Sequence, residues 1–170
     1  MFEITNYKIS LKCKIIFLDN VENILQQKSI KYKKFNNFLS FFENHFFIIF
    51  KNKINTKLNH INVTKIKSEI EIDNVIKYVE KTFNTIVVYN KVDNIIATCK
   101  SEIPLNLRLL TFKLKYPYKF NNEKFPGLFI KFCKGTSIVF HSGKIVILGC
   151  QTKQDIEWII QKLSVFIKIK

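Results

Sequence analysis

The chain has 170 residues and a mass of 20.2 kDa, and it carries 28 lysine and arginine residues against 13 acidic ones, a formal net charge of +15. Hydrophobic residues make up 47% of the sequence, which is enough for a core and excludes wholesale disorder. The basic excess predicts a polyanionic partner, with nucleic acid ahead of an anionic membrane surface. Length alone allows one ordinary domain or two short repeats.

The first half of the chain opens with an apolar, strand-like stretch that ends at Cys13. The block 32–42 and the β-rich run Phe46–Phe50 follow, and the polar segment Asn55–His60 predicts a loop. Segment 68–83 then has helical periodicity. Its apolar stripe consists of Ile72, Val75, Ile76, Val79 and Phe83.

The second half contains the same series of segments. A strand-like stretch ends at Cys99, the block 122–132 precedes the β-rich run Ser137–Phe140, and segment 152–167 has helical periodicity. Each apolar position of this last helix lies 84 residues after its counterpart in the first half. These positions are Ile156, Ile159, Ile160, Leu163 and Ile167.

The two halves therefore predict an internal repeat, with residues 1–90 as the first copy and 91–170 as the second. Both long helices begin with a hydroxyl residue and an acid three positions later, Ser68 with Glu71 and Thr152 with Asp155, the pattern of a capping box. Asp is the weaker form of that box. Two unrelated amphipathic helices would explain the stripes, but not the matching caps and spacings.

Each copy is expected to run strand, short helix, three or four strands and long helix, which is an α+β fold. The long helices can cover one face of an antiparallel sheet and leave the other face free. The phenylalanine and lysine content of that free face would then decide the function.

Four cysteines are spaced far apart, without a C-x-x-C pair. Buried thiols in a reducing compartment are the favoured interpretation, although a zinc site from Cys133, His141 and Cys150 is conceivable. We expect no metal or other cofactor. The first ten residues do not form a secretory signal, and the apolar stretch 35–50 is interrupted by polar residues, so no membrane span is expected.

Specific motifs in the sequence resemble the TATA-box-binding protein family. The block Phe125-Pro-Gly-Leu128 and the Ser142-Gly-Lys144 turn carry the strongest resemblance, and Asp93–Cys99 resembles the start of the family's second repeat. The first copy is similar through Lys34-Phe35, Ile49-Phe50 and the segment 63–69.

The resemblance implies two pseudo-symmetric repeats that form a saddle, with a concave antiparallel sheet on the DNA minor groove and helices on the convex face. It implies a transcription initiation factor that bends AT-rich promoter DNA. Phe35, Phe50, Phe125 and Phe140 would wedge between base steps, although a phenylalanine can equally be part of a sheet core. Double-stranded DNA, transcription factor IIB-like and IIA-like proteins and the RNA polymerase machinery are the implied partners.

The same resemblance implies further DNA-contacting residues. Asn94, Ile96, Thr64, Val146 and Leu148 would line the groove floor, where the acceptors of A·T pairs are displayed. Lys34, Lys131 and Lys144 would meet phosphates, and Glu123 would contact a transcription factor IIB-like partner.

The first copy departs from the family pattern at three positions, one of which is Asn62 in place of a floor valine. The resemblance places the matching asparagine of the first copy nine residues before Cys13, where this chain has Ile4, and Asn6 lies two residues away on the same strand face. Phe41 stands where a phosphate-binding arginine is expected. These changes predict weaker groove reading by the first copy.

Other functions have less support. The sequence has four glycines and three histidines without an evident catalytic partner, so an enzyme is not expected. The alternative within the resemblance is a saddle that has lost TATA specificity and acts as a protein-interaction module in a transcription complex. The composition fits a virus with a large DNA genome or an AT-rich protist, and the protein would act in the nucleus or at a viral replication site.

Overall fold

The computed structural model describes residues 1–14, 18–51 and 58–170, and the chain divides into two compact units. The N-terminal unit is Asn6–Asp93, and the C-terminal unit is Met1–Thr5 together with Asn94–Lys170. Strands β1 (Glu3–Lys14) and β6 (Val87–Lys100) each contribute residues to both units.

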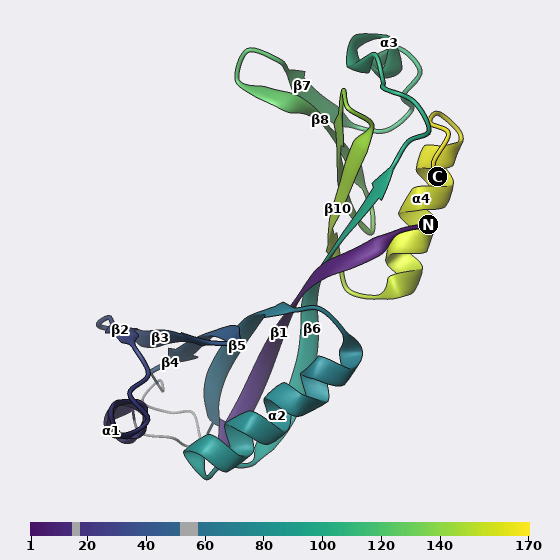
Figure 1. Ribbon diagram of the computed structural model, residues 1–170. Coiled ribbons are helices and arrows are strands. Elements are labelled where there is room, and N and C mark those ends of the chain that lie inside the picture. The colour runs from purple at the N-terminus through teal and green to yellow at the C-terminus, as the bar shows by residue number, and fades with distance from the viewer. Residues whose placement is uncertain (15–17, 52–57) are drawn as a thin grey trace. The chain divides into compact units, whose positions relative to one another are not determined.

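In the N-terminal unit, antiparallel strands follow the spatial order β2-β3-β4-β5-β1. Two helices lie against one face of this sheet (Figure 1). The remaining elements are α1 (Leu18–Gln27), β2 (Tyr32–Lys34), β3 (Phe38–Glu43), β4 (His45–Phe50), β5 (Leu58–Ile66) and α2 (Glu69–Phe83).

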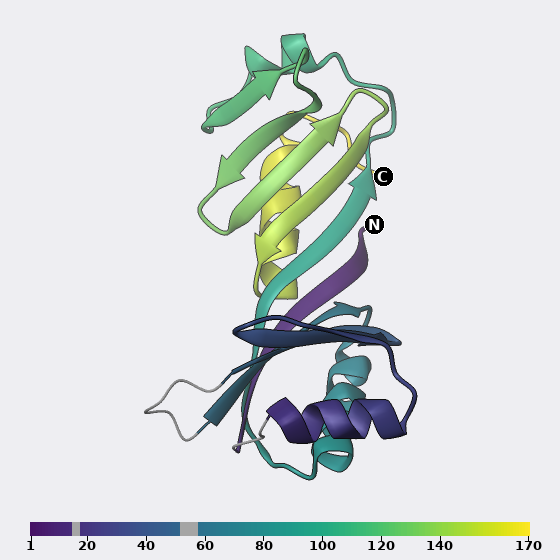
Figure 2. The same cartoon turned by 90° about the vertical axis from the view of Figure 1, so that its left-hand side faces the viewer.

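In the C-terminal unit, antiparallel strands follow the order β6-β10-β9-β8-β7. The long helix α4 packs against β9 and β10 and lies behind the strands in Figure 2. The elements after β6 are α3 (Leu107–Thr111), β7 (Tyr118–Asn121), β8 (Phe125–Phe132), β9 (Gly135–Phe140), β10 (Lys144–Cys150) and α4 (Lys153–Ser164).

The predicted order of elements is confirmed in both halves: one strand, a short helix, four strands and a long helix. The α+β class is therefore confirmed as well. The expected loop at Asn55–His60 is wrong in its second part, because β5 begins at Leu58. Residues 55–57 lie outside the described residues.

The two long helices begin where the sequence predicts, but their caps differ from the expectation. The complete capping box is the one at α4, where Asp155 Oδ2 accepts from the backbone N–H of Thr152 at 3.1 Å and Thr152 Oγ1 accepts from Asp155 N at 3.1 Å. At α2, Ser68 Oγ accepts from Glu71 N, whereas Glu71 Oε2 accepts from Lys67 N one residue earlier. The shorter Asp155 side chain therefore binds the N–H of its N-cap residue and completes the capping box, whereas the longer Glu71 side chain binds the N–H of the residue before the N-cap.

Helix stripes and alternate strand residues form the core of each unit. Val75, Val79 and Phe83 of α2 are buried in the N-terminal unit, as Ile156, Ile159 and Leu163 of α4 are in the C-terminal unit. Both sets belong to the stripes that the sequence repeats. In the described ranges, no helix is long and apolar enough to cross a membrane.

Replacing Ile159 by alanine should lower the free energy of unfolding by about 2–5 kcal/mol, because the side chain is fully buried and its loss leaves a cavity. Urea denaturation followed by circular dichroism measures the change. Ile70→Ala on α2 is the control, since Ile70 is 75% exposed and its truncation should change stability little. Equal effects of the two substitutions would contradict the described core.

Candidate nucleic-acid interface

The two faces of each sheet differ because the helices cover only one of them. In the N-terminal unit, the rings of Phe41 and Phe47 stack with centroids 4.7 Å apart, and Phe83 of α2 contacts Phe41 at 6.1 Å. Side chains alternate along a strand, and directly paired residues share a face. The strand neighbours of Phe41 and Phe47 therefore point away from the helices. We call this second face the open face of the unit.

The open face of the C-terminal unit is defined in the same way. Phe132 of β8 meets Trp158 of α4 with ring centroids 6.2 Å apart, so Phe132, Ile130 and Leu128 face the helix. Gly127, Phe129 and Lys131 alternate with them on the open face. The pairing register extends this assignment to Ile138 and Phe140 of β9, to Val146 and Leu148 of β10, and to Thr98 of β6.

Three phenylalanine rings gather on the open face of the C-terminal unit. The centroid of Phe125 lies 5.8 Å from that of Phe140 and 5.1 Å from that of Phe129, and Phe125 is 38% exposed. Gly127 lies directly opposite Phe140, and a Cβ at this glycine would come within 2.6 Å of the Phe125 ring. The absence of a side chain at Gly127 thus leaves room for the contact between Phe125 and Phe140, the pair of rings that the sequence predicts.

An equivalent cluster in the N-terminal unit is assembled differently. Phe35, which is 47% exposed, stacks on Phe38 at 4.3 Å, and Phe38 lies 5.9 Å from Phe50. Phe38 is directly opposite Phe50, the position that Gly127 holds opposite Phe140. A third ring therefore joins the predicted pair. Sequence reasoning missed Phe38, although its place opposite Phe50 follows once the hairpin register is known.

Each unit also contains an asparagine that holds a β-bulge. Asn94 Oδ1 accepts from Gly149 N at 2.6 Å, and Asn6 Oδ1 accepts from Lys65 N at 2.7 Å. Gly149 and Lys65 both have positive φ angles, 84° and 66°. With each Oδ1 bound to the backbone, the amide Nδ2 is the part of the side chain left to donate to an outside acceptor.

These bulges correct the expectation that the first copy has Ile4 in place of Asn94. Pairing resumes after the bulge with Ile9 opposite Val63 in one unit and Ala97 opposite Ile147 in the other, an offset of 88 residues along β1 and β6. With this offset, Asn94 corresponds to residue 6 and not to residue 4. Asn6 is therefore the counterpart of Asn94, and both copies keep this asparagine.

The same register identifies the floor of each open face, meaning the residues beside these asparagines. In the C-terminal unit the floor is largely apolar, and its half-buried members are Ile96, Thr98, Val146 and Leu148. In the N-terminal unit the corresponding positions are polar or charged: Lys8, Ser10, Asn62 and Thr64. Of the predicted floor residues, Thr64 thus lies in the N-terminal unit, and Asn94, Ile96, Val146 and Leu148 lie in the C-terminal unit.

A polar network occupies the floor of the N-terminal unit, and sequence reasoning did not find it. Ser10 Oγ donates to a carboxylate oxygen of Asp93 and lies 3.0 Å from Asn62 Oδ1. His60 Nε2 lies 2.8 Å from the same Asn62 oxygen and 3.2 Å from Ser10 Oγ. The residues come from β1, β5 and β6, and only the register brings them together.

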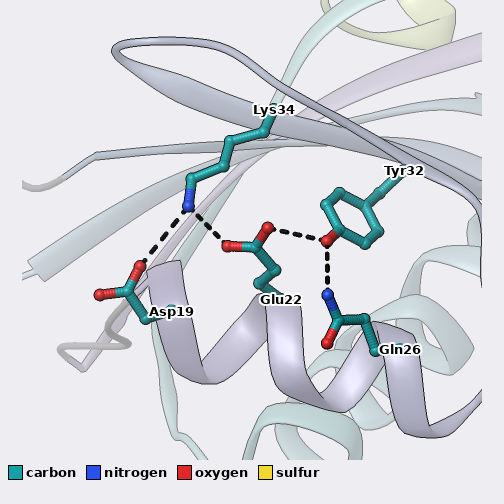
Figure 3. A network of polar contacts seen from close by, with 5 residues as sticks. All are labelled: Asp19, Glu22, Gln26, Tyr32 and Lys34. Carbon is teal, nitrogen blue, oxygen red and sulfur yellow. Dashed lines mark hydrogen bonds and ion pairs between the residues drawn. The ribbon is translucent and has the colours of Figure 1, made fainter.

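Lys34, a predicted phosphate contact, is held by acidic side chains of α1 (Figure 3). Its Nζ lies 2.6 Å from Glu22 Oε2 and 3.7 Å from Asp19 Oδ1, and Tyr32 donates to the other Glu22 oxygen at 2.7 Å. The hydrogen bond with Lys34 lowers the pKa of Glu22, and the same bond raises the pKa of Lys34. A phosphate would have to compete with these carboxylates.

The other predicted phosphate contacts, Lys131 and Lys144, are exposed. Phe41, expected at an arginine position, is buried against the helices, so that expectation is wrong by one residue. Phe42, which is 53% exposed, takes the open-face position that Lys131 has in the other unit, and Lys65 Nζ lies 4.5 Å from its ring centroid. The N-terminal unit thus replaces a cation with an aromatic ring.

Glu123, the predicted partner contact, lies in the exposed turn between β7 and β8, and its backbone N–H donates to Asn121 Oδ1 at 3.2 Å. Three of the four thiols are buried as expected, and Cys133 is exposed. Burial raises the pKa of Cys99 and of Cys150 to about 11, which keeps these thiols neutral at physiological pH. Among the described residues, no group of three potential metal ligands occurs, so the conceivable zinc site is not formed.

The fold defines a class of two-repeat proteins in which helices cover one face of each antiparallel sheet, and comparisons with known proteins find this class. The family described as "Transcription factor TFIID (or TATA-binding protein, TBP)" matches residues 89–168. A solved structure of Methanococcus jannaschii TBP is similar to 95% of this chain over 95% of its own length, with a TM-score of 0.78 and 25% identity. The second half of this chain is thus similar to the TATA-binding protein family, and the whole chain shares the fold of that solved structure.

Curated relatives match over a shorter range. The TATA-box-binding protein of Thermococcus celer is 32% identical over 80 residues, 46% of this chain and 42% of the relative. That of Acanthamoeba castellanii is 32% identical over 68 residues, 39% of this chain and 26% of the relative. The chain thus spans less than half the length of these curated relatives, and the family model matches the second copy.

Replacing Lys34 by methionine should raise the pKa of Glu22 toward 4.5, because the hydrogen bond from Lys34 is the largest cause of its lowering. Since the folded-state pKa is the lower one, this contact stabilises the fold above pH 4.5 and loses that contribution as the pH falls through the lowered value. NMR titration of the Glu22 carboxyl carbon measures the shift. Lys33→Met, on the same strand, is the control, and an unchanged pKa of Glu22 in Lys34→Met would contradict the ion pair.

Proposed function

We propose that this chain is a transcription initiation factor that binds AT-rich promoter DNA in the minor groove and bends it. The observation that carries the proposal is a cluster of partly exposed phenylalanines on the open face of each unit, in a chain whose second half is similar to the TATA-binding protein family. Residues 1–90 and 91–170 act as the two repeats, and each applies its open face to one half of the site.

The phenylalanines are the proposed wedges. An exposed ring is poorly solvated, and unstacking a base step costs a few kcal/mol, so both costs are reduced when a ring from Phe35, Phe50, Phe125 or Phe140 stacks on a base. Contacts between rings support this role, because Phe125 rests on Phe140 and Phe129, and Phe35 rests on Phe38. A braced ring loses little freedom when it inserts.

The floor and the rim supply the other contacts. The Nδ2 groups of Asn94 and Asn6 donate to minor-groove base acceptors. Ile96, Val146 and Leu148 pack against a groove that lacks the guanine amino group, and Thr64 contacts the groove from the N-terminal unit. Lys131 and Lys144 meet phosphates as point charges, and Lys34 does so only after it leaves Glu22. Glu123 contacts a transcription factor IIB-like protein, with IIA-like proteins and RNA polymerase as further partners in a nucleus or viral replication site.

One observation favours the second candidate function, an interaction module within a transcription complex. The N-terminal unit has a polar floor, a lysine paired with acids, and a ring in place of a cation at Phe42. These features weaken phosphate binding by that unit. Salt-sensitive binding without AT preference and without a bend would support this function over the first.

Replacing Phe125 by alanine should reduce the DNA bend, because the wedge is lost while the lysines remain. Energy transfer between dyes at the ends of an AT-rich duplex measures the bend. Phe112→Ala is the control, since Phe112 is 81% exposed at the end of α3 and takes no part in the ring contacts of the phenylalanine clusters. An unchanged bend with Phe125→Ala would count against the wedge.

Replacing Asn94 by alanine should reduce the preference for A·T over G·C pairs by about five- to a hundredfold, because good base-edge contacts are worth about 1–3 kcal/mol. Competition binding between AT-rich and GC-rich duplexes measures the preference. Asn6→Ala should lower the affinity for the preferred duplex by a similar factor, because its Nδ2 donates to base acceptors in the half of the site that the N-terminal unit binds. A large effect of Asn94 and none of Asn6 would mean that the first copy does not read the groove.

A further inference from the structure

The floors of the two open faces have opposite chemistry at matched positions. Val146 of the C-terminal unit corresponds to Asn62 of the N-terminal unit, and Ile96 corresponds to Lys8. Ser10 is 9% exposed and joins Asn62 to Asp93, so these polar groups are organised rather than scattered on a solvated surface. An organised polar floor indicates a different base-pair preference from that of an apolar one.

The hydrogen atoms of the network leave one acceptor unused. We assign Nε2–H of His60 to Asn62 Oδ1, which leaves the single hydroxyl proton of Ser10 for Asp93 Oδ2. The other carboxylate oxygen, Asp93 Oδ1, accepts no hydrogen bond from the described residues. Asp93 is half-buried, so the floor presents an oriented anionic acceptor.

Such an acceptor suits only one of the minor-groove patterns. An A·T pair displays two acceptors there, adenine N3 and thymine O2, and a carboxylate pressed against them would be a charge without a partner. A G·C pair adds the guanine amino group, which is a donor. Lys8, at the position of Ile96, supplies a donor for the acceptors that remain.

We propose that the N-terminal unit selects a base pair with a minor-groove amino group, guanine–cytosine in natural DNA, and that Asp93 is the specificity-determining residue. The C-terminal unit keeps the preference for A·T pairs. This inference rests on the proposed minor-groove binding, and it makes the preferred site asymmetric, with G·C pairs in the half bound by the N-terminal unit.

The test uses diaminopurine, which adds a minor-groove amino group to adenine without changing its pairing with thymine. The full chain is titrated with an AT-rich duplex and with the same duplex carrying diaminopurine in one half of the site. Wild-type protein should bind the half-substituted duplex about tenfold more tightly, the effect of one hydrogen bond to a charged group. Substitution in both halves should remove that gain, because the amino groups then meet Val146 and Leu148.

Asp93→Ala should abolish the tenfold preference, and Asp93→Asn, which keeps the size of the side chain, should reduce it severalfold. Asp73→Ala is the control, since it removes the same charge from an exposed position on α2 and should leave the ratio of affinities unchanged. Weaker binding of the half-substituted duplex by wild type and Asp93→Ala alike would overturn the inference, provided that the AT-rich duplex is bound and bent. Failure to bind or bend that duplex would overturn the proposed function as well.

Discussion

The alternation of side chains along antiparallel strands is the constraint on which the rest of this structure depends. In both units the long helix uses one set of alternate residues for the core, as Phe47 with α2 and Phe132 with α4 show. The remaining set, which includes Phe38, Phe50, Phe125 and Phe140, is left on a face that the unit's helices do not cover. The aromatic surface is thus a consequence of covering the sheet from one side.

Repetition of the fold does not impose repetition of the chemistry. Both units keep an asparagine that binds the N–H of a residue with positive φ, and the sequence meets that requirement with Gly149 in one unit and Lys65 in the other. Around this shared element the floors differ, apolar in one unit and polar in the other. A two-repeat protein can therefore read the two halves of an asymmetric target.

The sequence predicts the order of elements, the α+β class and the contact between Phe125 and Phe140, because each follows from periodicity or from repeat spacing. It does not predict features that depend on strand register. Strand register matches Asn6 rather than Ile4 with Asn94, and the longer link after Phe35 turns Phe42 rather than Phe41 to the open face. The network around Asp93 and the pairing of Lys34 with Glu22 join residues from separate elements, which no local pattern encodes.

The most direct test of minor-groove recognition is to replace every A·T pair of a bound duplex by inosine–cytosine. Inosine lacks the guanine amino group, so this duplex keeps the minor groove of A·T pairs while its major groove becomes that of G·C pairs. If the open faces contact the minor groove, the affinity and the bend should both be retained on the inosine–cytosine duplex. Loss of both on that duplex would contradict minor-groove recognition.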